Sequence, residues 1–212
     1  MLLIKLFLAV LLVYFIGSVF YSLLITSQFD KFKALFIKLF LGFFVLITLF
    51  SIFQTQGKTI NIALVFMAIL FFAKNKFQVN FKLQLLKNFR KDAKCLLYAC
   101  IPLLLFFSWR FYTLFQHNLD YPVVINMDGL KHVIRATFIV DLGIESLNVN
   151  YVVPPNGIEP YHYFEAWSVG CFGEIFNLNY WVAEQVLVFP FFSLLITLGV
   201  WGIIEKWNPK WY

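Results

Sequence analysis

Charged residues are scarce in this sequence. Only 13% of its 212 residues are Asp, Glu, Lys or Arg, whereas 61% are hydrophobic. An ordinary globular chain has about 25% charged and about 45–50% apolar residues. This deficit of charge excludes an ordinary water-soluble domain. The uncharged runs are long enough to cross a bilayer, which predicts an integral membrane protein.

Several motif classes are missing as well. The three cysteines, Cys95, Cys100 and Cys171, have neither the spacing of a metal site nor that of a disulfide framework. The chain has no glycine-rich phosphate loop, zinc pattern or nucleophile elbow. Its net charge of +6 comes from bases between and beside the apolar runs. That distribution is typical of membrane topology, and we therefore expect no nucleic acid partner.

The apolar runs predict an all-α, polytopic membrane protein with about five transmembrane helices. Residues 1–116 hold four of them and residues 184–212 hold the last, followed by a basic tail. The expected spans are 2–26, 34–53, 59–73, 95–115 and 185–204. The third run is shorter than the usual lower limit of about 17 residues, so flanking lysines would have to complete its crossing. If it does not cross, the N-terminus changes sides.

Charge reverses between two of the connecting segments. Residues 74–94 carry seven bases and a single acid, Asp92, which marks a cytoplasmic segment. Residues 117–183 are rich in acids and hold all three histidines, which predicts an extracytoplasmic segment. We therefore expect an integral protein of the bacterial inner membrane, in contact with its lipids, whose large segment lies outside.

The first candidate cluster lies on a helix expected over residues 128–142. Asp128, His132 and Arg135 fall on one face of it, at positions i, i+4 and i+7. A helix cap with a solvated polar stripe explains this pattern without a site. A carboxylate beside an imidazole and a guanidinium also suits general base catalysis, metal coordination or phosphate binding. Arg110, near the end of the fourth expected span, is either a snorkelling side chain or a second anion partner.

The second cluster lies on a short helix expected to start near Pro160. Tyr161, His162 and Tyr163 open it, and Glu165 follows within one turn. An aromatic belt with a hydrogen-bonded histidine is the simpler explanation, with Trp167 and other aromatic residues anchoring the helix in the interface. We expect this helix to pack against the first one, along the membrane surface. That arrangement would bring the two clusters together.

An outer-segment Asp128 with His132 four residues on, a GIESLN turn, a Pro-Pro linker and then PYHY resembles the polytopic glycosyltransferases of the GT-C superfamily. The resemblance implies transfer of a sugar from a polyprenyl-phosphate donor at the extracytoplasmic face. It implies that Asp128 is the catalytic base or a metal-associated acid, with a divalent metal as candidate cofactor. The other implied catalytic residues are His132, His162 and Glu165, and the implied substrate-binding residues are Arg110, Arg135, Tyr161 and Tyr163.

Members of that superfamily usually have more spans than this chain, so the resemblance also implies a further membrane subunit or a missing C-terminal part. The alternative is a non-catalytic membrane protein that binds a partner or a lipid through its outer segment. In that case the aromatic residues Tyr161, Tyr163 and Trp167 would matter more than Asp128.

Overall fold

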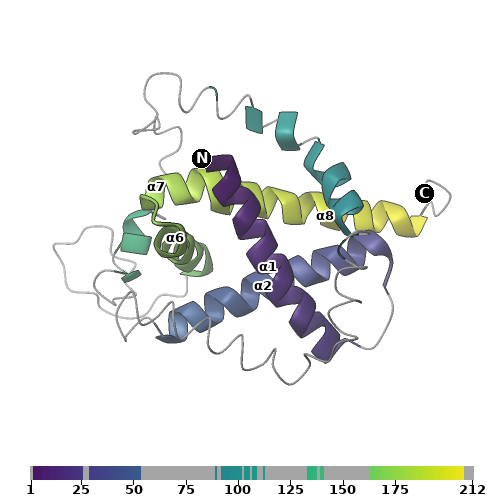
Figure 1. Cartoon of the computed structure of the whole chain (residues 1–212), viewed down its shortest axis with the longest axis horizontal. Helices are drawn as coiled ribbons and strands as arrows, with labels where there is room; N and C mark the ends of the chain where they lie inside the picture. Colours follow the sequence, from purple (N-terminus) through teal and green to yellow (C-terminus); the bar gives the residue numbers. More distant parts are fainter. Residues whose placement is uncertain are drawn as a thin grey trace.

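The computed structural model describes residues 2–25, 29–53, 89, 92–101, 103–105, 107–108, 112, 133–137, 139–140 and 163–207. Within these ranges the regular structure is helical throughout, and no strand occurs. Three helices are long and apolar enough to cross a membrane: α1 (Leu2–Leu24), α2 (Lys31–Phe53) and the continuous helix Tyr180–Trp207. A shorter helix, α6 (Tyr163–Phe176), packs among them (Figure 1).

Helices α1 and α2 cross in opposite directions at two glycines. A side chain at Gly17 would collide with the backbone carbonyl of Lys38, and one at Gly42 would collide with that of Val13. Small residues at such a crossing let two backbones approach closely, so that van der Waals contact holds the pair together. The local sequence thereby fixes where the two helices meet.

The last long helix changes its hydrogen-bonding pattern before a proline. It begins with α7 (Tyr180–Ala183), continues as the π-helix η3 (Glu184–Val188) and ends as α8 (Phe189–Trp207). Pro190 has no N–H to donate to the preceding turn and its ring crowds that turn. The wider π turn, in which the Phe189 N–H donates to Glu184 O, takes up this disturbance without breaking the helix.

Two helix ends are completed by charged side chains from other helices. Glu205 near the end of α8 accepts hydrogen bonds from the backbone N–H groups of Lys31 (3.3 Å) and Phe32 (2.9 Å), at the start of α2. Lys5 near the start of α1 donates to the carbonyl of Phe176, the last residue of α6, at 2.8 Å. Each charge also has the sign that stabilises the helix dipole at that end.

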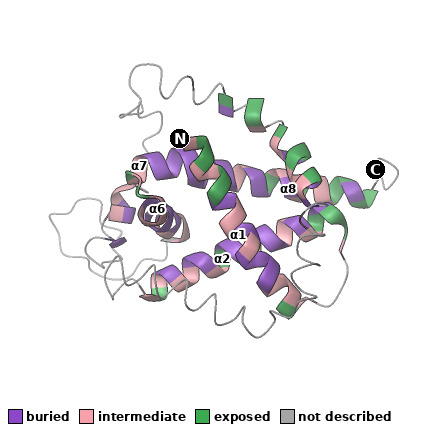
Figure 2. Ribbon diagram, in the orientation of Figure 1, coloured by how far each residue is buried: buried purple, intermediate pink, exposed green. Residues whose placement is uncertain are grey.

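These contacts define two ends of the bundle, which Figure 1 shows on opposite sides. The α6 end holds α6, the start of α1, the end of α2 and the start of the Tyr180–Trp207 helix. The lysine end holds the start of α2 and the end of α8, and it carries exposed lysines. The buried core runs between the two ends along α2 (Figure 2).

Phe43 of α2 occupies the centre of the core toward the α6 end. Its ring contacts the rings of Phe164, Phe172, Phe191 and Phe192 at centroid distances of 4.6–5.9 Å. Edge-to-face and offset contacts of this kind add about 0.5–1.5 kcal/mol per pair beyond burial alone. One α2 residue thus joins α6 to α8.

The expected spans 2–26 and 34–53 correspond to α1 and α2, and the expected span 185–204 lies within the Tyr180–Trp207 helix. Helix α2 begins three residues before the expected boundary, at Lys31, because Glu205 caps that end. The expected third span, 59–73, lies outside the described residues. The expected fourth span, 95–115, overlaps a helical stretch. We call the described residues of this stretch (92–101, 103–105, 107–108 and 112) the Asp92 segment, and all of them are helical.

We expect Gly17→Ala to lower the free energy of unfolding by about 1–3 kcal/mol, the usual cost of overpacking. The added methyl group would meet a backbone oxygen of Lys38, which can move only if α1 and α2 separate. Denaturant unfolding of the purified protein in detergent micelles measures the change.

Gly199→Ala is the matched control for this substitution. The same methyl group there would approach only the ring of Phe36, at an ordinary contact distance of 3.8 Å. Alanine also favours a helix over glycine by up to about 1 kcal/mol. Equal destabilisation by both substitutions would contradict the close crossing at Gly17.

Candidate functional site

The structure describes only part of the cluster expected in the outer segment. The side chains of Glu165 and Arg135 are described, and Tyr163 is placed as the first residue of α6. The other five expected site residues lie outside the described residues, and they are Arg110, Asp128, His132, Tyr161 and His162. The structure therefore describes the expected site only at Arg135, Tyr163 and Glu165.

Glu165 lies in the first turn of α6 and is half-buried. A carboxylate at that position is stabilised by the unpaired N–H groups and the positive end of the helix dipole. In the sequence, Glu165 follows Tyr163, the first residue of α6, by two positions.

Arg135 belongs to the helical residues 133–137, and it is only 8% exposed. The next part of this segment packs directly on α6: an ideal Cβ at Gly170 lies 3.9 Å from the Ala136 carbonyl and meets a methyl group of Val140. Ala136 and Val140 are buried at this contact. Gly170 is needed there because any side chain would push the two segments apart.

Three aromatic side chains of α6, Phe164, Trp167 and Phe172, pack against rings of α2. The sequence predicted that Trp167 and Phe172 anchor the helix in the membrane interface, but Phe172 is completely buried against Phe43 and Phe191. Trp167 packs edge-on against Phe50 of α2, with ring centroids 6.1 Å apart. The prediction is wrong for Phe172, because α2 and α8 supply aromatic partners that a local sequence pattern does not reveal, whereas for the half-buried Trp167 it stays a prediction.

A second polar cluster lies inside the bundle, and the sequence reasoning missed it. Lys38 of α2 and Asp92 form an ion pair whose side chains are 9% and 10% exposed. The same carboxylate oxygen accepts a hydrogen bond from Tyr14 of α1 at 2.6 Å. Three separate parts of the chain therefore meet at one carboxylate, surrounded by apolar residues.

Aromatic rings complete the surroundings of this charge pair. The Lys38 ammonium lies 5.7 Å from the ring centroid of Tyr14 and 5.4 Å from that of Tyr21, which is within range of cation–π attraction. Phe89 contacts Tyr14 edge-on at 5.6 Å. The cluster is thus held by charge, hydrogen bonding and aromatic contact together.

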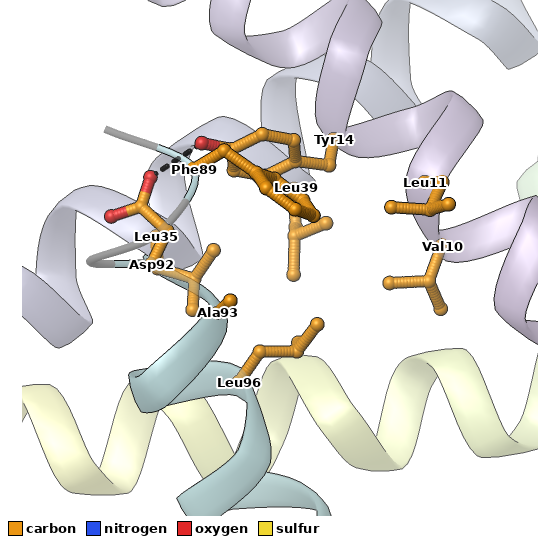
Figure 3. Close-up of a pocket in the computed structure, with 9 residues that line it drawn as sticks. All are labelled: Val10, Leu11, Tyr14, Leu35, Leu39, Phe89, Asp92, Ala93 and Leu96. Atoms are coloured by element: carbon orange, nitrogen blue, oxygen red, sulfur yellow. Dashed lines mark hydrogen bonds between the residues drawn. The ribbon is translucent and has the colours of Figure 1, made fainter. Parts of the chain in front are cut away.

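A small cavity adjoins the cluster, and Figure 3 shows Tyr14 and Asp92 joined at its edge. Its volume is about 10 Å³, the lower limit for holding one water molecule, and its walls are almost entirely apolar. Leucines and Val10 form most of the lining. A cavity of this size and character cannot hold a substrate, so we interpret the cluster as a structural element.

The signal that could have revealed this pair is the isolation of its members. Lys38 is the only charge in the interior of an otherwise uncharged run, and Asp92 is the only acid among seven bases. A charge inside an apolar bundle needs a partner of opposite sign. Placing Lys38 near one end of a span, and Asp92 in a basic cytoplasmic segment, hid their pairing.

The described residues offer neither a metal cluster nor a reactive thiol. Within those ranges no three His, Cys, Asp or Glu side chains gather to hold a metal ion. Asp128, the candidate metal ligand, lies outside them. Cys171 of α6 is completely buried, and this burial raises the pKa of its thiol well above the ordinary value. A neutral, inaccessible thiol is inert.

Comparison of the chain with family models, with curated proteins and with solved structures finds no match. The class of the protein therefore rests on the structure itself. Its described residues include three helices that are long and apolar enough to cross a membrane, which is compatible with a membrane protein.

We expect Lys38→Met or Asp92→Leu alone to destabilise the protein by about 3–5 kcal/mol, because each leaves an unpaired charge among apolar side chains. The double variant should recover most of that loss, because it removes both charges. The free energy of unfolding, measured by titrating micelles with sodium dodecyl sulfate, reports all three values.

Lys33→Met serves as the control, since Lys33 is an exposed lysine of the same helix. It should change stability by less than about 0.5 kcal/mol. Losses that simply add in the double variant would show that Lys38 and Asp92 do not depend on each other.

Proposed function

We propose that the chain is an integral membrane protein that crosses the bilayer five times. Helix α2 ends at Phe53, at the α6 end of the bundle. The Asp92 segment starts beside Lys38, about two turns from the opposite end of α2. The chain between Phe53 and Phe89 has to return across the bundle, which supports a crossing by the third apolar run.

The Asp92 segment then supports a fourth crossing. It starts near the lysine end, and its Phe107 contacts Phe189 at 6.1 Å, in the half of the last helix nearer α6. The chain thus arrives at the α6 end before residues 117–183 begin. Together with α1, α2 and the Tyr180–Trp207 helix, this path gives five crossings, with the N-terminus and the large segment on one side.

The orientation follows from the charges at the two ends. Exposed lysines from α2, α8 and the Asp92 segment gather at the lysine end, whereas the acids of α6, Glu165 and Glu174, lie at the other. Bases concentrate on the cytoplasmic side of membrane proteins. We therefore place the lysine end in the cytoplasm and residues 117–183 outside, in a bacterial inner membrane.

Single cysteines in a variant lacking Cys95, Cys100 and Cys171 test this topology. We expect Gln56→Cys and Asn156→Cys to react with a membrane-impermeant maleimide added to intact cells. Asp30→Cys and Lys87→Cys should react only after permeabilisation. Labelling of positions 56 and 87 from the same side would contradict the third crossing, and labelling of positions 30 and 156 from the same side would contradict the outer placement of residues 117–183.

For the activity, we propose a GT-C-like glycosyltransferase, or a part of one, that transfers a sugar from a polyprenyl-phosphate donor at the extracytoplasmic face. The observation that carries this proposal is the packing of Ala136 and Val140 on Gly170. It joins the segment expected to carry Asp128, His132 and Arg135 to the helix that follows His162. This contact supports a site whose two halves share one end of the bundle.

The chemistry of such a site needs a base and a cation. Asp128 would accept the proton of the attacking hydroxyl, or hold a divalent metal beside the donor phosphate. Arg135 would supply positive charge toward that phosphate, as a guanidinium does well. Glu165 is about 7.5 Å along the helix axis from Gly170, on the side of His162, and it would orient that imidazole.

We expect Asp128→Asn to reduce sugar transfer at least about 100-fold, the usual contribution of a positioned general base. Transfer of a radiolabelled sugar from its polyprenyl phosphate, in membranes that contain the full-length protein, measures the loss. Asp120→Asn is the matched control, because it neutralises another acid of the same outer segment. Unchanged transfer and unchanged donor binding in Asp128→Asn would contradict the proposed role.

A non-catalytic protein that binds a lipid or a membrane partner is the second candidate. It is favoured by the exposed apolar side chains of the Asp92 segment, among them Leu97 (62%), Tyr98 (62%) and Leu105 (74%). If this candidate holds, Tyr161→Ala and Tyr163→Ala should weaken co-purification of a partner while Asp128→Asn leaves it unchanged. Trp167 does not discriminate, because its ring contacts Phe50 of α2 and its loss would also disturb helix packing.

A further inference from the structure

Four exposed lysines from three parts of the chain belong to the lysine end. Lys31 and Lys33 lie in the first turn of α2, Lys94 follows the start of the Asp92 segment, and Lys206 lies in the last turn of α8. We call these four residues the lysine cluster. The three parts of the chain that carry them are far apart in the sequence, so their common position depends on the fold.

The start of α2 and the end of α8 are joined by direct contacts. The Glu205 carboxylate accepts hydrogen bonds from the N–H groups of Lys31 and Phe32. An ideal Cβ at Gly202 lies 3.5 Å from the Cα of Lys33. Glu205 and Gly202, which make these contacts, lie within about one helical turn of Lys206. Lys206 therefore belongs to the same end of the bundle as Lys31 and Lys33.

The Asp92 segment joins the same end. Cys95, the neighbour of Lys94, is buried in the hydrophobic core that also holds Phe32 of α2 and Leu198 of α8. Figure 1 shows the start of this segment beside the end of α8. Lys94 thus adds its charge to those of α2 and α8.

The exposed lysines outnumber the acids at this end, so its surface carries a net positive charge. Glu205 is only 8% exposed, and its two oxygens cap α2. Asp92 is buried in its pair with Lys38. Among the described residues of this end, Asp30 is the one exposed acid beside the four lysines.

Aromatic side chains surround the lysine cluster at the same level. Trp207 is 83% exposed at the end of α8, and Trp201 stacks on Phe32 with ring centroids 5.7 Å apart. The Lys33 ammonium lies 4.6 Å from the ring centroid of Phe29. Tryptophan and lysine together are typical of the depth at which lipid head groups lie.

We propose that the lysine cluster binds the head groups of anionic phospholipids in the leaflet on that side. This inference rests on the proposed membrane insertion. An ammonium group is a compact point charge suited to a lipid phosphate, and several of them near one membrane surface attract anionic lipid. Bound lipid would also bridge α2, α8 and the Asp92 segment, because each of them contributes a lysine.

Thermal unfolding of the purified full-length chain in neutral detergent micelles tests this proposal. Phosphatidylglycerol should raise the Tm of the wild type, whereas an equal amount of phosphatidylcholine should not. Replacing all four lysines with Gln should remove at least half of that rise. Replacing them with Arg should preserve it, since the charge remains, and 0.5 M salt should reduce it in both charged forms.

Lys5→Gln is the control from the opposite end of the bundle, and it should leave the lipid-induced rise unchanged. If the fourfold Gln variant does not fold, Lys94→Gln with Lys206→Gln should still lose part of the rise. An equal rise with both lipids, an undiminished rise in the Gln variants, or its loss in the Arg variant would overturn the proposal.

Carbonate extraction of membranes from the expressing cells separates this inference from the one on which it rests. Release of the chain into the aqueous fraction would contradict membrane insertion itself. A chain that stays in the membrane fraction but shows no preference for phosphatidylglycerol would contradict only lipid binding by the lysine cluster.

Discussion

An ion pair with very little access to water constrains the whole bundle. Lys38 and Asp92 are 54 residues apart in the sequence, yet neither charge can be left without the other among apolar side chains. Their pairing therefore determines where the chain must return after α2. Lys38 also lies at the α1–α2 crossing, because its carbonyl group faces Gly17 while its ammonium reaches Asp92. One residue thus links the close packing of two helices to the position of a third segment.

Much of the helical arrangement can be predicted from the sequence because its physical cause is local. An uncharged run of more than about 20 residues has few alternatives to a spanning helix. The helix boundaries are harder to predict from the sequence, because Glu205, which caps α2, is 174 residues away from Lys31 along the chain. The Lys38–Asp92 pair and the inward-facing Phe172 are equally non-local. Each depends on a partner that becomes adjacent only after the helices have packed.

The outer segment shows the same division. Its helical pattern correctly predicted that residues near Arg135 and the helix after His162 are helical, and the Gly170 contact joins the two. A sequence pattern does not give the burial of Arg135, which depends on neighbours from elsewhere in the chain. The roles assigned to Asp128, His132 and His162 stay predictions, since these residues lie outside the described ranges.

The two ends of the bundle differ in the charged side chains that they present. At the lysine end, the buried Glu205 carboxylate caps α2, and the exposed lysines outnumber the one exposed acid among the described residues, Asp30. At the α6 end, Lys5 is engaged by the Phe176 carbonyl, so the base nearest to α6 in α1 is already occupied. Anionic groups that approach the α6 end would therefore depend on Arg135 and on bases of the outer segment. At the α6 end, this asymmetry favours a phosphate site built by the outer segment over one built by the spans.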